Sequence, residues 1–206
     1  MPRERTEELV EWYLRLNGYF IIPNFILHPL MPCRSQRTEI DLLGVRFPYQ
    51  TEVVCDSEGR RLQMENDEKL IDNRFVDCLI VSVKGPESKA EVNRKIKVFQ
   101  NLKDVIKRFG FVESEEKIAD VAKDLLREKK AVKDQFQIRF LGIAGKFNEY
   151  SKTKQIIFKE IGEFISTRFQ AYKNHKADTE QWNGLGKEML RNCFKEPWEF
   201  LESILN

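Results

Sequence analysis

The sequence lacks the features that mark several common classes of protein. Its four cysteines, Cys33, Cys55, Cys78 and Cys193, lie far apart and form no CxxC pair, so neither a disulfide framework nor a zinc knuckle is expected. No apolar run approaches the ~18 residues of a membrane-spanning helix, and the charged start "MPRERTEEL" leads directly into a helical pattern. We therefore expect a cytoplasmic protein with reduced thiols and no membrane partner.

The sequence also lacks an excess of one charge sign and a group of histidines. The formal net charge is +2 although 33% of the residues are charged, so overall electrostatics neither require nor exclude a nucleic-acid partner. His28 and His175 have no ligand-like spacing, which favours structural or exposed roles. Any functional signal must therefore come from local patterns.

Hydrophobic periodicity predicts helices in several regions of the chain. Apolar residues recur at helical spacing within each region. The predicted helices cover residues 6–16, the stretch from just after Pro86 to Gly110, residues 114–130, residues 157–172, and shorter segments around Trp182 and Trp198.

Runs rich in β-branched and aromatic residues predict four strands, over residues 19–27, 38–47, 77–84 and 135–147. Pro23 indicates that the first strand is either an edge strand or a broken one. The third is apolar on both faces and belongs in the centre. The stretch between the second and third strands reads as a hairpin or a surface excursion. We expect an α/β fold with a mixed sheet flanked by helices, in which residues 1–150 form the core and residues 151–206 form a helical C-terminal extension packed on it.

Polar side chains that could take part in catalysis lie near the ends of the second and third predicted strands. Alternation along a strand puts Glu39 and Asp41 on one side, ~7 Å apart along the backbone, and likewise puts Ser82 and Lys84 on one side. Carboxylate oxygens bind Mg²⁺, and an ammonium group beside a water suits phosphodiester hydrolysis. A nucleophilic role for Ser82 is disfavoured because no histidine lies near it in the sequence.

An Asp on the second core strand, a Lys at the end of the third and a following helix resemble the PD-(D/E)xK nuclease superfamily, whose fold is restriction endonuclease-like. The segments "GYFIIPN", "RTEIDLLGVRFP" and "IVSVKG" are similar to its Mrr-like and Holliday-junction-resolvase-like branches. The tail "EFISTRFQAYKNHKADTEQW" is similar to small nuclease-like proteins of prokaryotes. The resemblance implies a nuclease with Mg²⁺ or Mn²⁺ as cofactor and nucleic acid, foremost DNA, as partner. It also implies a homodimer.

The resemblance further implies roles for individual residues. Asp41 would bind the metal, and Lys84 would orient or activate the attacking water. An acid of the first helix would assist, and Glu8 is the candidate because it borders the apolar stripe that contains Leu9. The backbone carbonyl of Val83 would complete the metal coordination.

Ser82 stands where this superfamily usually has Glu or Asp, so the motif reads SxK and one metal ligand is missing. A hydroxyl brings no negative charge to a hard dication. Some type II restriction enzymes are similar in having SxK with the acid moved to the following helix, and Glu91 falls on that predicted helix. Glu39 is the other candidate donor. The alternative is a catalytically inactive nuclease-fold protein that binds nucleic acid or a protein partner.

A basic segment follows the third strand. Residues 84–108 contain eight Lys or Arg residues and three acids, a net local charge of +5. Lys89, Arg94 and Lys97 would follow the phosphate backbone of a nucleic acid along the predicted helix, with Asn93 as a neutral donor.

Each of these patterns also has a purely structural interpretation. Asp41 and Glu39 fit solvated residues near a strand end, or partners of Arg37. Lys84 fits a side chain that extends from a strand end into water. The basic segment fits a solvated helix face.

Overall fold

The structure is a computed structural model that describes residues 5–28, 38–56, 58–175 and 184–205. These residues form eight strands and six helices. Their order is α1 (Arg5–Leu16), β1 (Phe20–Leu27), β2 (Thr38–Arg46), β3 (Glu52–Cys55), β4 (Arg61–Met64), β5 (Val76–Val83), α2 (Phe99–Phe109), α3 (Glu115–Glu128), β6 (Lys130–Lys133), β7 (Phe136–Ala144), β8 (Lys154–Ile157), α4 (Phe158–His175), α5 (Gly184–Asn192) and α6 (Pro197–Leu205).

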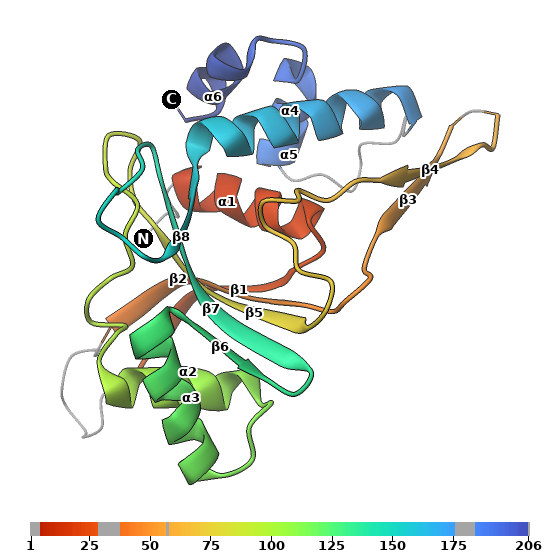
Figure 1. The fold of residues 1–206 in the computed structure, drawn as a ribbon. Coiled ribbons are helices and arrows are strands. Elements are labelled where there is room, and N and C mark those ends of the chain that lie inside the picture. The colour runs from red at the N-terminus through yellow and green to blue at the C-terminus, as the bar shows by residue number, and fades with distance from the viewer. Residues whose placement is uncertain (1–4, 29–37, 57, 176–183, 206) are drawn as a thin grey trace.

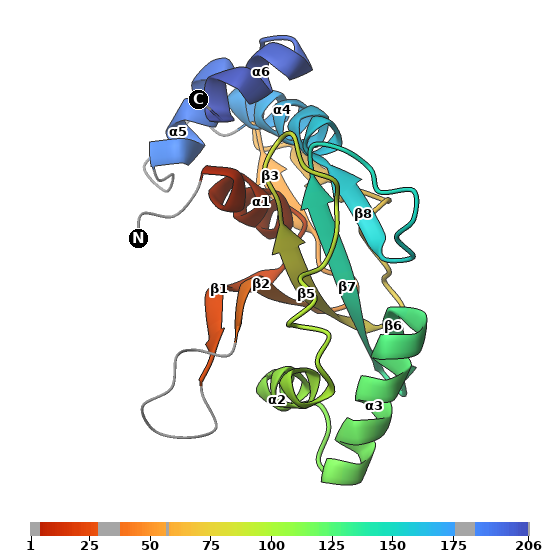
Figure 2. The ribbon, with the colours of Figure 1, turned by 90° about the vertical axis from the view of Figure 1, so that its left-hand side faces the viewer.

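Six strands form one mixed sheet in the order β1-β2-β5-β7-β6, with β8 also paired to β7. The central strands β5 and β7 run parallel, as Figure 2 shows, and β2 runs antiparallel to β5. β1 lies at an edge, one of the two forms that Pro23 predicts. β5 lies in the centre and is buried from Asp77 to Val83, as its apolar faces predict. β3 and β4 form a separate hairpin, one of the two forms expected for that stretch.

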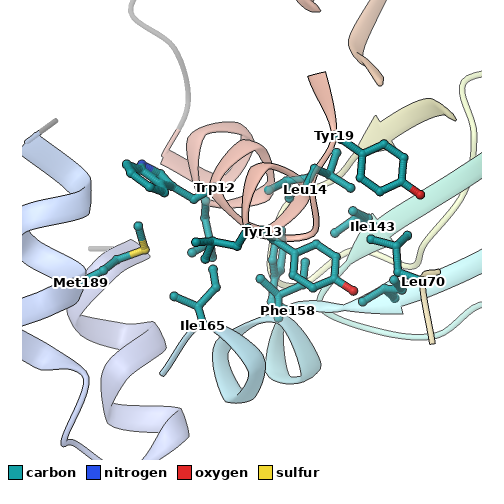
Figure 3. Packing of buried hydrophobic residues seen from close by; sticks show 14 of the residues in the cluster. Trp12, Tyr13, Leu14, Tyr19, Leu70, Ile143, Phe158, Ile165 and Met189 are labelled. Atoms are coloured by element: carbon teal, nitrogen blue, oxygen red, sulfur yellow. The ribbon is translucent and has the colours of Figure 1, made fainter. Parts of the chain in front are cut away.

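Helices cover both faces of the sheet (Figure 1): α1, α4, α5 and α6 on one side, α2 and α3 on the other. The buried side chains form two clusters. The first joins Tyr13 of α1, Ile165 of α4 and Met189 of α5 (Figure 3), and the second joins Ile80 of β5 to Leu102 of α2. The expected α/β fold with helices on both faces is therefore confirmed. The segment 151–206 supplies a sheet strand, β8, in addition to its helices.

The helix predicted to begin after Pro86 is wrong in its first half, because α2 begins at Phe99. The preceding residues form turns and extended segments in which buried Ala90 and Val92 alternate with exposed neighbours. The amide of Ala90 donates to the carbonyl of Lys146 at 2.9 Å. Pairing with the chain after β7 thus replaces helical hydrogen bonds in this loop.

The sequence patterns predict neither β6 nor β8. Both are four-residue strands on the outer edge of β7. Four residues are too few for strand alternation to stand out in the sequence. Lys129 ends α3 with a left-handed φ of 62° and turns the chain directly into β6.

Candidate functional site

The candidate site lies where β2 and β5 stop pairing. The antiparallel ladder ends at the Leu42–Val81 pair, and the next residues on the two strands, Asp41 and Ser82, meet through their side chains. Oδ2 of Asp41 accepts hydrogen bonds from the backbone amide of Val83 at 2.6 Å and from Oγ of Ser82 at 3.3 Å. The carboxylate thus replaces the backbone acceptor that β2 would offer if the ladder continued.

Lys84 directly follows β5 and is held by the neighbouring strand. Its amide donates to the carbonyl of Ile143 on β7 at 2.8 Å, and its side chain is half-buried. Its positive charge lowers the pKa of Asp41, so the two side chains lie within electrostatic range of each other. The structure therefore brings together the two residues to which the sequence assigns the central roles.

The pKa of Asp41 is raised above its ordinary value, chiefly because burial disfavours the charged form. The amide of Val83, the ammonium of Lys84 and the hydroxyl of Ser82 oppose this shift, whereas the negative charge of Glu39 adds to it. The carboxylate is thus held in a partly desolvated place where its charge is not fully compensated. A bound cation would supply that compensation.

The other predicted acids differ in how the structure places them. Of the two candidates for the missing ligand, Glu39 is the one whose charge acts on Asp41. Glu91 is exposed on the loop that replaces the predicted helix, and its charge acts on Lys97. Glu8 is half-buried on α1, whose apolar residues belong to the first cluster. Its catalytic role stays a prediction.

The residues near the end of the ladder include oxygen donors of the kinds that could hold Mg²⁺. Asp41 and Glu39 offer carboxylates, and Val83, whose amide bonds to Asp41, offers its backbone carbonyl. Mg²⁺ is commonly held by one or two carboxylates together with waters and substrate phosphates. Within the described residues, no three His, Cys, Asp or Glu side chains converge as a metal cluster.

Two glycines allow the loop after Lys84 to lie against β7. A Cβ at Gly145 would lie 1.5 Å from the carbonyl oxygen of Pro86, and a Cβ at Gly142 would lie 3.3 Å from the amide nitrogen of Glu91. Sequence reasoning missed both positions. The available signal is the segment "LGIAGK", where a buried strand of bulky residues is interrupted twice by glycine, which indicates close backbone approach.

The predicted phosphate-binding residues lie on this loop and not on a helix. Lys89 and Arg94 are exposed and form no ion pair with any described residue. Lys97 is half-buried, and its pKa is lowered by burial and then by the positive charge of Lys129, with a smaller contribution from Arg94. Cations that depress the pKa of a neighbouring lysine mark a region of positive potential.

Asn93 and two lysines of α2 are engaged within the protein. Oδ1 of Asn93 accepts a hydrogen bond from the amide of Lys95 at 3.0 Å and so shapes the turn. The ammonium groups of Lys103 and Lys107 both contact the carboxylate of Glu115 on α3. The available positive charge is therefore centred on the loop before α2.

Comparisons with protein-family models, with curated proteins and with solved structures find no match to this chain. No helix among the described residues is long and apolar enough to cross a membrane. Cys55, Cys78 and Cys193 are free thiols. Cys33, Arg37 and Trp182, which also entered the sequence predictions, lie outside the described residues.

Proposed function

We propose that the chain is a Mg²⁺- or Mn²⁺-dependent nuclease of the PD-(D/E)xK type that hydrolyses phosphodiester bonds, with DNA as the expected substrate. The observation that carries this proposal is the Asp41 carboxylate, partly buried where β2 and β5 separate, bonded to Val83 and within range of Lys84. The exposed cations Lys89 and Arg94, on the loop that follows Lys84, support a polyanionic partner.

The proposal assigns a role to each residue of the site. Asp41, Glu39 and the carbonyl of Val83 would hold the metal, which supplies a Lewis acid for the scissile phosphate. Lys84 orients the attacking water and offers its ammonium to the charge that develops on the phosphate. Ser82 donates to Asp41 and fixes the orientation of that carboxylate.

A second function is favoured by Ser82, which is 1% exposed and occupies the position of the usual acid. Without that acid the site retains its hydrogen bonds but has one negative charge fewer for a metal. The second candidate is therefore a catalytically inactive nuclease-fold protein that binds nucleic acid or a protein partner. A cleavage assay distinguishes the two functions. A binding assay does not, because the cations of the loop would contribute to nucleic-acid binding in both.

Calorimetric titration with Mg²⁺ and with Mn²⁺ tests the metal site. We expect the wild type to bind and Asp41→Asn to lose binding, because the amide keeps an acceptor for Val83 but carries no charge. Glu149→Gln, which removes an exposed acid between β7 and β8, is the matched control and should bind as the wild type does. Equal metal binding by Asp41→Asn, or none by the wild type, contradicts the assignment.

Cleavage of labelled DNA and RNA, single-stranded and duplex, tests the chemistry. Lys84→Ala should lower the metal-dependent rate by about 10²–10⁴, the range for a positioned proton-transfer group. A wild-type protein that binds metal and nucleic acid but cleaves none of these substrates favours the second function.

Binding of DNA at increasing salt tests the basic loop. Lys89→Glu combined with Arg94→Glu should weaken binding to every sequence and reduce its dependence on salt, because fewer counterions are released. Lys187→Glu combined with Lys195→Glu makes the same change of charge at exposed positions of the C-terminal segment. If both pairs weaken binding equally, the loop is not the contact surface.

A further inference from the structure

A pocket at the outer edge of β7 is separate from the Asp41 site. It has a volume of about 440 Å³, within the ~300–1,000 Å³ typical of small-molecule sites. It lies near the junction where β6 pairs with β7 up to Arg139 and β8 pairs with β7 from Leu141 onward. Its lining includes Gln137 and Arg139 of β7 together with Lys130, Lys152 and Lys154.

Gln137 is a buried amide without a partner. It has no exposed surface, and neither Nε2 nor Oε1 forms a hydrogen bond with any described residue. Buried amides are nearly always paired, and leaving one unpaired costs free energy. Gln137 is among the residues that line the pocket, so a ligand that reaches its covered amide would pair with it. The amide offers both a donor and an acceptor, which suits the edge of a nucleobase.

Arg139 is fixed on one side and has a donor left on the other. Its Nε and Nη2 bind the carboxylate of Asp77 at 3.0 and 2.6 Å, and Nη2 also donates to the carbonyl of Leu70. Its Nη1 forms no hydrogen bond with any described residue. A guanidinium held in this way is preorganised for an anionic oxygen.

The rim of the pocket carries lysines that are available to an anion. Lys152 and Lys154 are exposed and form no ion pair with the described part of the chain. Nζ of Lys130 lies 3.9 Å from the carboxylate of Asp72, which Arg74 holds more closely at 2.8 Å. Six Lys or Arg residues and two acids, Asp72 and Glu128, line the pocket, and this excess of positive charge favours a phosphate group.

We propose that this pocket binds a nucleoside monophosphate unit, with its phosphate on Lys152, Lys154 and Arg139 and the hydrogen-bonding edge of its base on Gln137. A free nucleotide and the phosphorylated end of a nucleic-acid strand share this chemistry. The proposal requires neither a metal nor cleavage at Asp41. It can therefore be tested independently of the proposed nuclease function.

Calorimetric titration of the full chain with adenosine 5′-monophosphate tests the pocket, beside adenosine, inorganic phosphate and an oligonucleotide with and without a 5′-phosphate. We expect the monophosphate to bind more tightly than adenosine or phosphate alone. Tight binding of the free nucleotide identifies it as the ligand, whereas a preference for the phosphorylated oligonucleotide identifies a strand end.

Two variants locate the binding. Gln137→Leu removes the unpaired amide, so it should raise the thermal midpoint of unfolding while it weakens binding of the monophosphate about tenfold or more. Lys152→Ala combined with Lys154→Ala changes only exposed residues and should weaken the monophosphate and inorganic phosphate alike. Lys187→Ala combined with Lys195→Ala is the matched control and should leave binding unchanged.

Three results would overturn the proposal. The first is a wild-type protein that binds neither the monophosphate nor the phosphorylated oligonucleotide. The second is inorganic phosphate that binds as tightly as the monophosphate, since the amide of Gln137 would then read no base. The third is binding that survives the double lysine variant unchanged, which remains decisive even if Gln137→Leu fails to fold.

Discussion

Replacing Ser82 by an acid tests whether the candidate site is a metal site that lacks one charge. Ser82 is buried, and its Oγ lies 3.3 Å from Oδ2 of Asp41. Ser82→Glu therefore sets a second carboxylate beside the first in a place from which water is largely excluded. Ser82→Gln adds almost the same volume without the charge, so the difference between the two variants isolates the electrostatic effect.

The size of that effect follows from the short separation. Two like charges about 4 Å apart repel by ~4 kcal/mol at an effective dielectric constant of ~20. Relaxation of the larger side chain reduces this, so we expect Ser82→Glu to be about 2–4 kcal/mol less stable than Ser82→Gln without divalent metal. A Mg²⁺ ion between the two carboxylates replaces repulsion by attraction, so added metal should remove most of the difference.

Urea unfolding at neutral pH, in a chelator and then in millimolar Mg²⁺, measures both quantities. The same preparations also allow cleavage to be compared, and Ser82→Glu should exceed the wild type if the missing acid is what limits metal binding. If Glu39 already supplies the second charge, Ser82→Glu should not raise cleavage, and the wild-type rate should depend on Glu39. Equal stability of the two variants in chelator, or equal stabilisation of both by Mg²⁺, would refute the reasoning.

Three further predictions concern stability and pH. Gly145→Ala forces a Cβ onto the carbonyl of Pro86 and should destabilise the fold by about 1–3 kcal/mol or more, as measured by urea unfolding. Asp77→Asn leaves the charge of Arg139 buried without its carboxylate and should cost about 3–5 kcal/mol in the same assay. The raised pKa of Asp41 means that its ionisation opposes folding. The stability advantage of Asp41→Asn should therefore be absent below about pH 4 and grow as pH rises through the raised pKa, while metal binding by the wild type weakens as pH falls through it.

Matched variants separate these effects from general damage to the fold. Gly85→Ala is the control for Gly145, because its nearest atom is Oγ of Ser88 at 3.9 Å, and an equal loss in both variants would contradict the close-approach argument. Asp72→Asn removes the partner of exposed Arg74 and should cost much less than Asp77→Asn, because solvent screens an exposed ion pair. A similar cost for Asp77→Asn would mean that its ion pair adds little. A pH-independent difference between the wild type and Asp41→Asn would contradict the raised pKa.

Apolar patterns predicted the centre of the fold because the strands there are long enough for such a pattern to be recognised in the sequence. β5 is buried on both sides and carries Ser82 just before its last residue, and β2 carries Asp41 near its start. An antiparallel neighbour at the centre of the sheet brings these two ends together. The juxtaposition of Asp41 with Ser82 and Lys84 was therefore predictable from strand lengths, apolar patterns and the resemblance.

The loop before α2 was not predictable in the same way. Its apolar residues Val92 and Ile96 are four apart, which fits a helix, and only contacts distant in sequence decide otherwise. Ala90 pairs with the carbonyl of Lys146, and Gly145 admits the backbone of Pro86. No local pattern encodes a contact across more than 50 residues, so the position of the basic residues had to come from the structure.

Asp41 also has a structural role, which any test of its function must take into account. Where β2 and β5 separate, the amide of Val83 has no backbone acceptor on β2, and the carboxylate takes that place at 2.6 Å. Asp41→Ala would therefore leave a backbone donor unpaired as well as remove a charge, and its loss of activity would not distinguish the two causes. Asp41→Asn retains an oxygen acceptor of the same shape. If that variant folds at least as stably as the wild type but no longer binds metal, the negative charge of Asp41 serves the metal, and its hydrogen bond to Val83 serves the fold.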